Sequence, residues 1–303
     1  MSAERSLTRR LPHNRLEARC ERAAWPRATH ERAADIRGPL GVEAPPPGGI
    51  LEQREQQQLI DRFRAARRDA ELAVLEGFHP LKHAIRFGAE LCAVVTRDMI
   101  ELELLAEQLG PDVRAAVTAR ATVVPSEVFE QLSPGAQEIG VISLALRPEI
   151  TPEHLLALPQ QSPVVLLESP THLGNVGAVV RVAAAASAAA VITTGTQDPW
   201  HPSALRGSAG LHFAIPVLRA GNTTIAGRPL IALDPEGDDL ELTSIPSNAV
   251  LAFGSERTGL SDELLRRADA RVRIPMEAAV SSLNLATAVA VVLYSWRLRQ
   301  GSA

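Results

Sequence analysis

Three polar segments, two of them containing glycine, hold the side chains of this chain that are best suited to chemistry. They are residues 174–181, residues 253–261, and residues 274–276 with 280–286, and each follows an apolar run of the kind that forms a buried strand. Glycine lets a ligand approach backbone N–H groups closely, while Asn, Arg and Glu side chains can orient a polar substrate. We therefore expect a ligand site built from loops that follow strands.

Each of these polar residues also has an ordinary structural interpretation. Asn175 is typical of a glycine-bearing turn, Arg181 in an apolar helical run can form an interdomain salt bridge, and Glu256 can cap a helix. Ser282 and Asn284 can cap the last helix. It is their occurrence together, in this order, that favours a functional site.

The segment 254–261 matches a phosphate-binding P-loop except at one position. Leu260 stands where that loop needs lysine, so the β- and γ-phosphates would lose their main side-chain counter-charge. The spacing of a G-x-S-x-G nucleophile elbow is absent, and no G-x-G-x-x-G fingerprint follows the first strand of this region. We therefore expect neither nucleoside-triphosphate hydrolysis nor dinucleotide binding.

The spacing of histidines and cysteines does not favour a metal centre. His79 and His83 are four residues apart, but Pro80 lies between them and no acidic or cysteine ligand is arranged nearby. Cys20 and Cys92 are far apart and neither belongs to a C-x-x-C pair. We expect no bound metal and no disulfide framework.

The elements that must position the three segments alternate between strand-like and helix-like patterns from residue 164 onward. We expect strands at 164–168, 190–194, 230–233, 249–253 and 270–274. We expect helices at 176–189, 203–209, 261–268 and 282–299. Strands interleaved with helices predict an α/β domain with a parallel sheet, whose ligands bind beyond the carboxyl ends of the strands.

A smaller α/β domain is expected before this one. Its expected helices are residues 51–77, 82–87, 99–109 and 126–132, and its expected strands are residues 91–96, 121–124 and 140–146. Four prolines between residues 147 and 163 mark a boundary. We therefore divide the chain into an arginine-bearing arm (1–50), a first domain (51–150), a linker (151–163) and a second domain (164–303).

The composition is that of a globular protein, because hydrophobic residues make up 46% and charged residues 22% of the chain. No apolar run is long enough to cross a bilayer and the N-terminus lacks the apolar core of a signal peptide, so we expect a cytoplasmic protein without membrane contact. The net charge is −4, although residues 1–40 hold nine Arg against five acidic residues. Binding to a polyanion must therefore be local; the arm could touch RNA phosphate or be a solvated tail.

The three segments, in their order and at strand ends, resemble the three motifs of the SpoU/TrmH class of RNA ribose 2′-O-methyltransferases, within the SPOUT superfamily. The resemblance spans residues 164–300, and residues 206–217 are similar to the family segment between the first two motifs. Residues 75–82 and 137–143 resemble the substrate-binding domain that precedes the catalytic domain in many members, which has a ribosomal-protein L30e-type fold. The first motif departs from the family pattern at residues 171–173, where an acidic residue or Asn followed by Pro is common.

The resemblance implies a trefoil-knotted catalytic domain that binds S-adenosylmethionine, and a homodimer with active sites at the subunit interface. It places the catalytic set at Asn175, Arg181, Glu256, Ser282 and Asn284. It places the cofactor contacts at Leu233, Gly254, Ile274, Met276 and Leu283.

The reaction needs the ribose 2′-hydroxyl, a weak nucleophile, to be positioned and to lose its proton as it attacks. Because arginine is essentially never deprotonated in proteins, we expect Arg181 to grip the target phosphate and stabilise the developing alkoxide, with the proton passing to phosphate or water. Glu256 would orient an arginine, and Asn175 and Asn284 would hold loops and substrate.

We expect methylation of a ribose in structured RNA, with 23S ribosomal RNA favoured over tRNA because the L30e-type fold reads RNA shape. A tRNA methyltransferase and a non-catalytic RNA-binding or ribosome-assembly factor remain as alternatives. The cationic residues expected to contact RNA lie outside the three segments: Arg62, Arg64, Arg67, Arg68, Lys82, Arg86 and Arg206.

Overall fold

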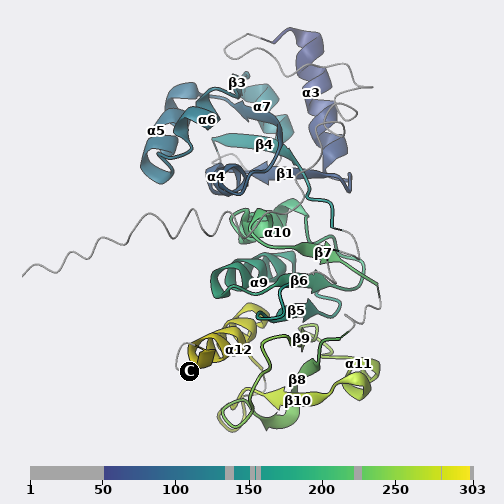
Figure 1. Ribbon diagram of the computed structural model, residues 1–303. Coiled ribbons are helices and arrows are strands. Elements are labelled where there is room, and N and C mark those ends of the chain that lie inside the picture. The colour runs from purple at the N-terminus through teal and green to yellow at the C-terminus, as the bar shows by residue number, and fades with distance from the viewer. Residues whose placement is uncertain are drawn as a thin grey trace, which may run out of the picture.

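The computed structural model describes residues 51–133, 140–150, 154, 158–221, 227–280 and 282–300. The arm expected at 1–50 lies outside the described residues, as do Ser281 and part of the linker. Two sheets form two domains, and Figure 1 shows β1 and α4 of the first domain lying next to α10 of the second.

The first domain is a mixed four-stranded sheet in the order β1-β4-β2-β3, with helices packed on it. Strand β4 pairs antiparallel with both β1 and β2, and β2 pairs parallel with β3. The strands are β1 (Leu72–Glu76), β2 (Leu91–Thr96), β3 (Ala121–Val123) and β4 (Val141–Leu146). The helices are α3 (Gln53–Ala66), α4 (Phe78–Arg86), α5 (Met99–Leu109), α6 (Arg114–Thr118) and α7 (Ser126–Leu132).

The helix expected over residues 51–77 is wrong in its second half. Helix α3 ends at Ala66, and residues 72–76 form strand β1, in which all five residues are buried. A run buried on every residue fits a strand covered on both faces and has no helical period. The side chain of Asp69 accepts a hydrogen bond from the Glu71 amide at 2.7 Å, which forms the turn between the two elements.

The second domain is a six-stranded sheet in the order β10-β8-β9-β5-β6-β7, and every pair of neighbours is parallel. The strands are β5 (Val164–Leu167), β6 (Ala190–Thr193), β7 (Val217–Arg219), β8 (Leu230–Asp239), β9 (Val250–Phe253) and β10 (Ala270–Arg273). The helices are α9 (Leu173–Ala186), α10 (Pro202–Gly207), the short 3-10 helix η2 (Leu211–Phe213), α11 (Asp262–Arg267) and α12 (Leu285–Gln300). The expected α/β class with a parallel sheet is confirmed; the knot stays a prediction.

Two strands of this sheet differ from expectation. Strand β7 is three residues long and was not expected, because so short a run carries no period. Strand β8 extends to Asp239, well past the apolar run at 230–233, because its polar second half pairs through the backbone with β10.

Helices α9 and α10 pack unusually closely. A side chain on Gly177 would place its Cβ 2.2 Å from the carbonyl oxygen of Ala204, and one on Gly207 would place it 3.0 Å from that of Gly174. Glycine is therefore required where the two helices cross. This contact couples α10, which faces the first domain, to α9, which carries Asn175 and Arg181.

None of the helices in the described ranges is both long enough and apolar enough to span a bilayer.

Candidate active site

The candidate site lies at the carboxyl ends of neighbouring strands of the parallel sheet. Strand β5 leads into residues 168–172, β9 leads into residues 254–261, and β10 leads into residues 274–284. Because all strands of this sheet run the same way, the three loops share one edge of it. That shared edge brings the three sequence segments together.

A chain of hydrogen bonds joins polar residues from all three loops. The Asn175 side chain donates from Nδ2 to Glu256 Oε1 at 2.8 Å. The other carboxylate oxygen of Glu256 accepts from the Thr171 hydroxyl at 2.8 Å and from its amide at 3.2 Å. Asn284 donates from Nδ2 to Asn175 Oδ1 at 3.1 Å. These four residues form one network, defined here as the polar bridge.

Asn284 also caps the last helix. Its Oδ1 accepts from the amides of Ala286 at 2.9 Å and Thr287 at 3.3 Å, at the start of α12. The helix-cap interpretation and the site interpretation of Asn284 therefore hold at once, and the position of α12 is tied to the polar bridge.

The carboxyl group of Glu256 is ionised at neutral pH. Partial burial acts to raise its pKa, but hydrogen bonds from Asn175, from its own amide and from Thr171 outweigh that effect and lower the pKa to about 2. Its oxygens accept from Thr171 and Asn175, and no arginine of the described residues pairs with it. Glu256 is therefore an acceptor that fixes the loops and not a proton donor.

A pocket opens beside the polar bridge, and its walls are mainly apolar. All five residues expected to contact a cofactor line it, as do Glu256 and Ser282. The full lining is Leu233, Asp234, Pro235, Phe253, Gly254, Ser255, Glu256, Val272, Arg273, Ile274, Met276, Ser282, Leu283, Leu285 and Ala288. An apolar cleft with a few convergent polar groups is typical of a small-molecule site.

The loop after β9 is closed so tightly that only glycine fits at its start. A Cβ on Gly254 would lie 2.0 Å from the carbonyl carbon of Gly259. The amides of Ser255 and Gly259 each donate to the other residue's carbonyl oxygen, both at 3.1 Å. Leu260 packs its side chain against the hydrophobic core, which explains why the P-loop lysine position is apolar here.

Two residues of the site were not expected from the sequence. Thr171 lies where the first motif departs from the family pattern, and its hydroxyl and amide hold Glu256. Glu168 accepts from the Ser261 hydroxyl at 2.6 Å and from its amide at 2.7 Å, and so joins the end of β5 to the start of α11. The only sequence signal for both is their position at, or within three residues of, the end of an expected strand.

Arg181 lies apart from the polar bridge. It is exposed on α9 and makes no hydrogen bond or ion pair with the described part of the chain. The pKa of His79 is lowered, most by burial, then by the charge of Lys82, and least by the charge of Arg181. The charge of Arg181 therefore acts on His79 of helix α4 in the first domain.

The seven cations expected to contact RNA lie on α3, α4 and α10 or next to them, and most have protein partners. Arg64 pairs with Asp61, Arg86 pairs with Asp112, and both Arg67 and Arg206 pair with Glu76. Lys82 is 8% exposed and donates to the carbonyl oxygen of Leu109 at 3.1 Å. Arg62 and Arg68 have no ion pair with a described residue, so the contact surface itself stays a prediction.

The histidine pair of the first domain also has a structural partner. His83 Nδ1 lies 2.6 Å from the carbonyl oxygen of Ala209 in the second domain. Within the described ranges no three His, Cys, Asp or Glu residues are grouped to hold a metal ion.

Comparison with known proteins places this geometry in a family. Residues 162–294 match the model of the SpoU rRNA Methylase family. The 23S rRNA (uridine(2479)-2′-O)-methyltransferase of Streptomyces viridochromogenes is 28% identical over 257 residues, which are 80% of this chain and 87% of that protein. The 23S rRNA (adenosine(1067)-2′-O)-methyltransferase of Streptomyces azureus is 27% identical over 248 residues, which are 78% of this chain and 90% of that protein.

Solved structures agree with the sequence relatives. The AdoMet-bound rRNA methyltransferase from Sinorhizobium meliloti is 26% identical, with a TM-score of 0.65 over 80% of this chain and 94% of that chain. An RNA 2′-O ribose methyltransferase is also 26% identical, with a TM-score of 0.67 over 83% of this chain and 97% of that chain. Both the second domain and the domain before it are covered, and the second domain, over residues 162–294, belongs to the SpoU rRNA Methylase family.

Proposed function

We propose that this protein transfers the methyl group of S-adenosylmethionine to a ribose 2′-hydroxyl of 23S ribosomal RNA. The observation that carries the proposal is the polar bridge of Thr171, Glu256, Asn175 and Asn284 beside a mainly apolar pocket, with Glu256 belonging to both. The named activities of the relatives from two Streptomyces species, which align with most of this chain, support the same reaction.

The pocket suits S-adenosylmethionine. Leu233, Ile274, Met276 and Leu283 offer apolar walls for the adenosine, and the tight turn at Gly254 leaves backbone groups accessible. The cofactor supplies a methyl group on positively charged sulfur, and the acidic side chains of Asp234 and Glu256 at the pocket wall favour such a charge.

Arg181 is the residue that meets RNA. Its guanidinium has no partner among the described residues and is exposed, so it is available to a backbone phosphate. We assign it the grip on the target phosphate and the stabilisation of charge that develops on the attacking oxygen.

No side chain of the polar bridge is suited to act as the general base. Glu256 has a pKa of about 2, and both of its oxygens already accept hydrogen bonds. Asn175, Asn284 and Ser282 hold loops and substrate. The proton of the 2′-hydroxyl therefore passes to the RNA phosphate or to water.

In this proposal the first domain, residues 51–150, binds RNA. The linker at 151–163 joins it to the catalytic domain at 164–303. The enzyme works in the cytoplasm. The cations on α3, α4 and α10 supply electrostatic attraction to the RNA backbone. This attraction is local, because the whole chain carries a net charge of −4.

We also propose a homodimer, with α12 in its interface. Val291, Tyr294 and Leu298 are exposed on this helix, with Leu298 at 68% and Tyr294 at 41%. An exposed apolar surface next to a catalytic pocket is typical of an interface between subunits.

Sedimentation should show a dimer for the protein and a monomer for the double variant Val291→Glu, Leu298→Glu. Leu242→Glu, at a position that is 85% exposed outside α12, is the matched control and should stay dimeric. A wild-type monomer at micromolar concentration would overturn this interface.

The function is tested with unmodified transcripts of 23S rRNA and tRNA incubated with S-adenosylmethionine that carries a deuterated methyl group. Mass spectrometry of the nucleosides should find the heavy methyl on a ribose of 23S rRNA, and Arg181→Ala should abolish it. Label on a base, label on tRNA alone, or no label would each overturn the proposal.

A further inference from the structure

A buried carboxylate joins the two domains. Glu76 ends strand β1 of the first domain and is 6% exposed. One of its oxygens accepts from Arg67 of its own domain at 2.8 Å, and the other accepts from Arg206 on helix α10 of the second domain. Arg67 also donates to the carbonyl oxygen of Leu132 at 2.8 Å, so the arginine is held from two sides.

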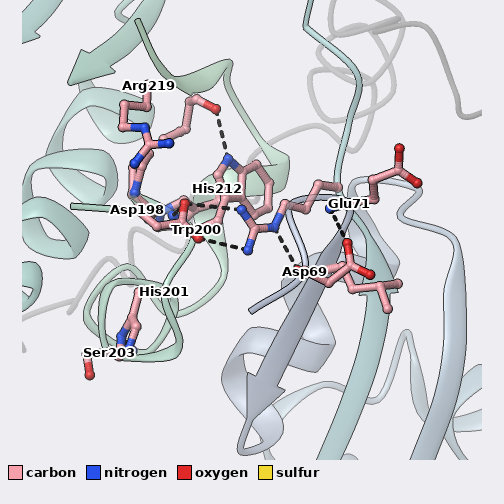
Figure 2. A network of polar contacts seen from close by, with 12 residues as sticks. Asp69, Glu71, Asp198, Trp200, His201, Ser203, His212 and Arg219 are labelled. Atoms are coloured by element: carbon pink, nitrogen blue, oxygen red, sulfur yellow. Dashed lines mark hydrogen bonds and ion pairs between the residues drawn. The ribbon is translucent and has the colours of Figure 1, made fainter. Parts of the chain in front are cut away.

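A second contact crosses the boundary next to the first. Arg147, at the end of β4, pairs with Asp198 at 2.9 Å, donates to the carbonyl oxygen of Leu72 at 2.7 Å, and lies over the ring of Trp200. Figure 2 shows Asp198, Trp200 and His212 together on the second domain, with Asp69 and Glu71 of the first domain on the other side of the network. The Arg147 side chain is 11% exposed and that of Asp198 is 40% exposed, so water reaches this pair from the Asp198 side.

The part of the second domain that receives these contacts is rigid. Trp200 donates from Nε1 to the carbonyl oxygen of Val217 at 2.9 Å. His212 is fully buried between Ser208 Oγ at 2.7 Å and the Pro199 carbonyl at 2.8 Å. Burial lowers the pKa of His212 to about 4, so the ring is neutral at physiological pH and its contacts do not change there. We call residues 198–213 the platform.

Backbone packing fixes a third point. A Cβ on Gly210 of the platform would lie 2.6 Å from the backbone of Pro80 in helix α4, so the two segments touch directly. His83 of the same helix contacts the carbonyl oxygen of Ala209 at 2.6 Å. Three separate contacts restrict the rotation of one domain on the other more than a single contact would.

We propose that Glu76 is a positioning residue, which holds the RNA-binding domain in one orientation on the platform so that bound RNA delivers its target ribose to Arg181. The path is continuous, because Glu76 holds Arg206 on α10, α10 packs through Gly207 and Gly177 on α9, and α9 carries Arg181. The proposal rests on the proposed function. A shift of about 1 Å at a reacting centre costs on the order of 100-fold in rate, so orientation matters more here than attraction.

The decisive variant is Glu76→Gln, because the two interpretations of Arg67 and Arg206 predict different effects on kcat. If the arginines only attract RNA, removing the neighbouring negative charge strengthens RNA binding and leaves turnover intact. If Glu76 positions the domain, kcat for methyl transfer falls about 10- to 100-fold, while the Kd values for RNA and for S-adenosylmethionine stay within about 2-fold or improve. Unchanged or faster turnover overturns the proposal.

The matched control is Glu130→Gln, which makes the same change of charge on an exposed residue of α7 in the same domain. It should leave kcat unchanged.

Should Glu76→Gln fail to fold, as judged by circular dichroism, Arg206→Met removes the contact from the other side, where the arginine side chain is 53% exposed. Arg206→Lys should restore part of the lost kcat, and equal loss in the Met and Lys variants overturns the charge pairing.

X-ray scattering separates this proposal from the proposed function, because it needs no RNA. The Glu76→Gln protein should give a broader distribution of interatomic distances than the wild type, since one of the three contacts that fix the orientation of the two domains is weakened. An unchanged distribution overturns the positioning role even if the enzyme methylates RNA. Failure of the wild type to methylate RNA, with the scattering change present, would instead overturn the proposed function alone.

Discussion

The Asn284 side chain donates to Asn175 Oδ1 at 3.1 Å across 109 residues of sequence. One amide therefore ties the start of α12 to the start of α9, and Asn175 passes the connection on to Glu256. Neighbouring loops of a parallel sheet are often joined by water or by backbone contacts. Here the side chains of Asn284, Asn175 and Glu256 connect the loops, so the role of each can be tested by a single substitution.

Two substitutions at Asn284 separate the helix cap from the bridge. Ser keeps an oxygen that can cap α12 but loses the amide that reaches Asn175, whereas Ala loses both. We expect Asn284→Ala to lower the free energy of unfolding by about 0.5–2 kcal/mol and Asn284→Ser to lower it much less. Both variants should also reduce the rate of methyl transfer. Denaturant unfolding measures the stability of each variant, and a methyl-transfer assay measures its rate. A fully active Ser variant would show that the bridge is not needed.

The low pKa of Glu256 predicts a pH-dependent contribution to stability. A carboxyl group whose pKa falls to about 2 on folding, from the ordinary 4.5, favours the folded state when it is ionised. This contribution is complete above about pH 5 and is lost as the pH falls toward 2. In urea unfolding, Glu256→Gln should therefore be less stable than the wild type at pH 7, and the gap should narrow at pH 3. A gap that is equal at both pH values would contradict the assigned hydrogen bonds.

Gly254→Ala should disturb the cofactor pocket. The added Cβ would lie 2.0 Å from Gly259, so the loop after β9 must move, at a cost of about 1–3 kcal/mol. We expect the rise in Tm that S-adenosylhomocysteine gives the wild type to disappear. Gly174→Ala is the control, because its Cβ meets no atom within 4 Å. If Gly254→Ala kept the full rise in Tm, the pocket would not be the cofactor site.

Arg181→Lys tests whether the guanidinium geometry matters beyond its charge. Lysine keeps the positive charge but cannot form two parallel hydrogen bonds with a phosphate. We expect kcat to fall at least about 10-fold while the dependence of RNA affinity on salt stays the same, since the number of cations is unchanged. Stopped-flow or single-turnover methyl transfer and a salt titration of RNA binding measure the two quantities. Nearly full turnover would show that a point charge is enough.

The sequence predicted most of the fold where elements carried a clear period. The helices at 99–109 and 126–132 coincide with α5 and α7, and the apolar runs of the second domain coincide with β5, β6, β9 and β10 to within a residue. The prediction failed where the local sequence pattern does not decide the structure. Residues 72–76 are a short apolar run that lies between two helices, and their pairing with β4 makes them a strand.

The site was predictable only in part, for a physical reason. Chemical type and order marked Asn175, Glu256 and Asn284, and resemblance marked the residues that line the pocket. Thr171 and Glu256 are 85 residues apart, and Glu76 and Arg206 are 130 apart. Such contacts depend on how the loops and domains meet, which no local pattern records, so a cation that looks free in the sequence is paired in the fold.

Calorimetric titration of the purified wild-type protein with S-adenosylmethionine tests the central claim most directly, because every assigned role depends on a methyl donor in the pocket beside Asn175 and Glu256. We predict a heat of binding that fits one site per chain and a matching heat with S-adenosylhomocysteine, both lost in Gly254→Ala. No heat at two temperatures, together with no rise in Tm, would contradict the account.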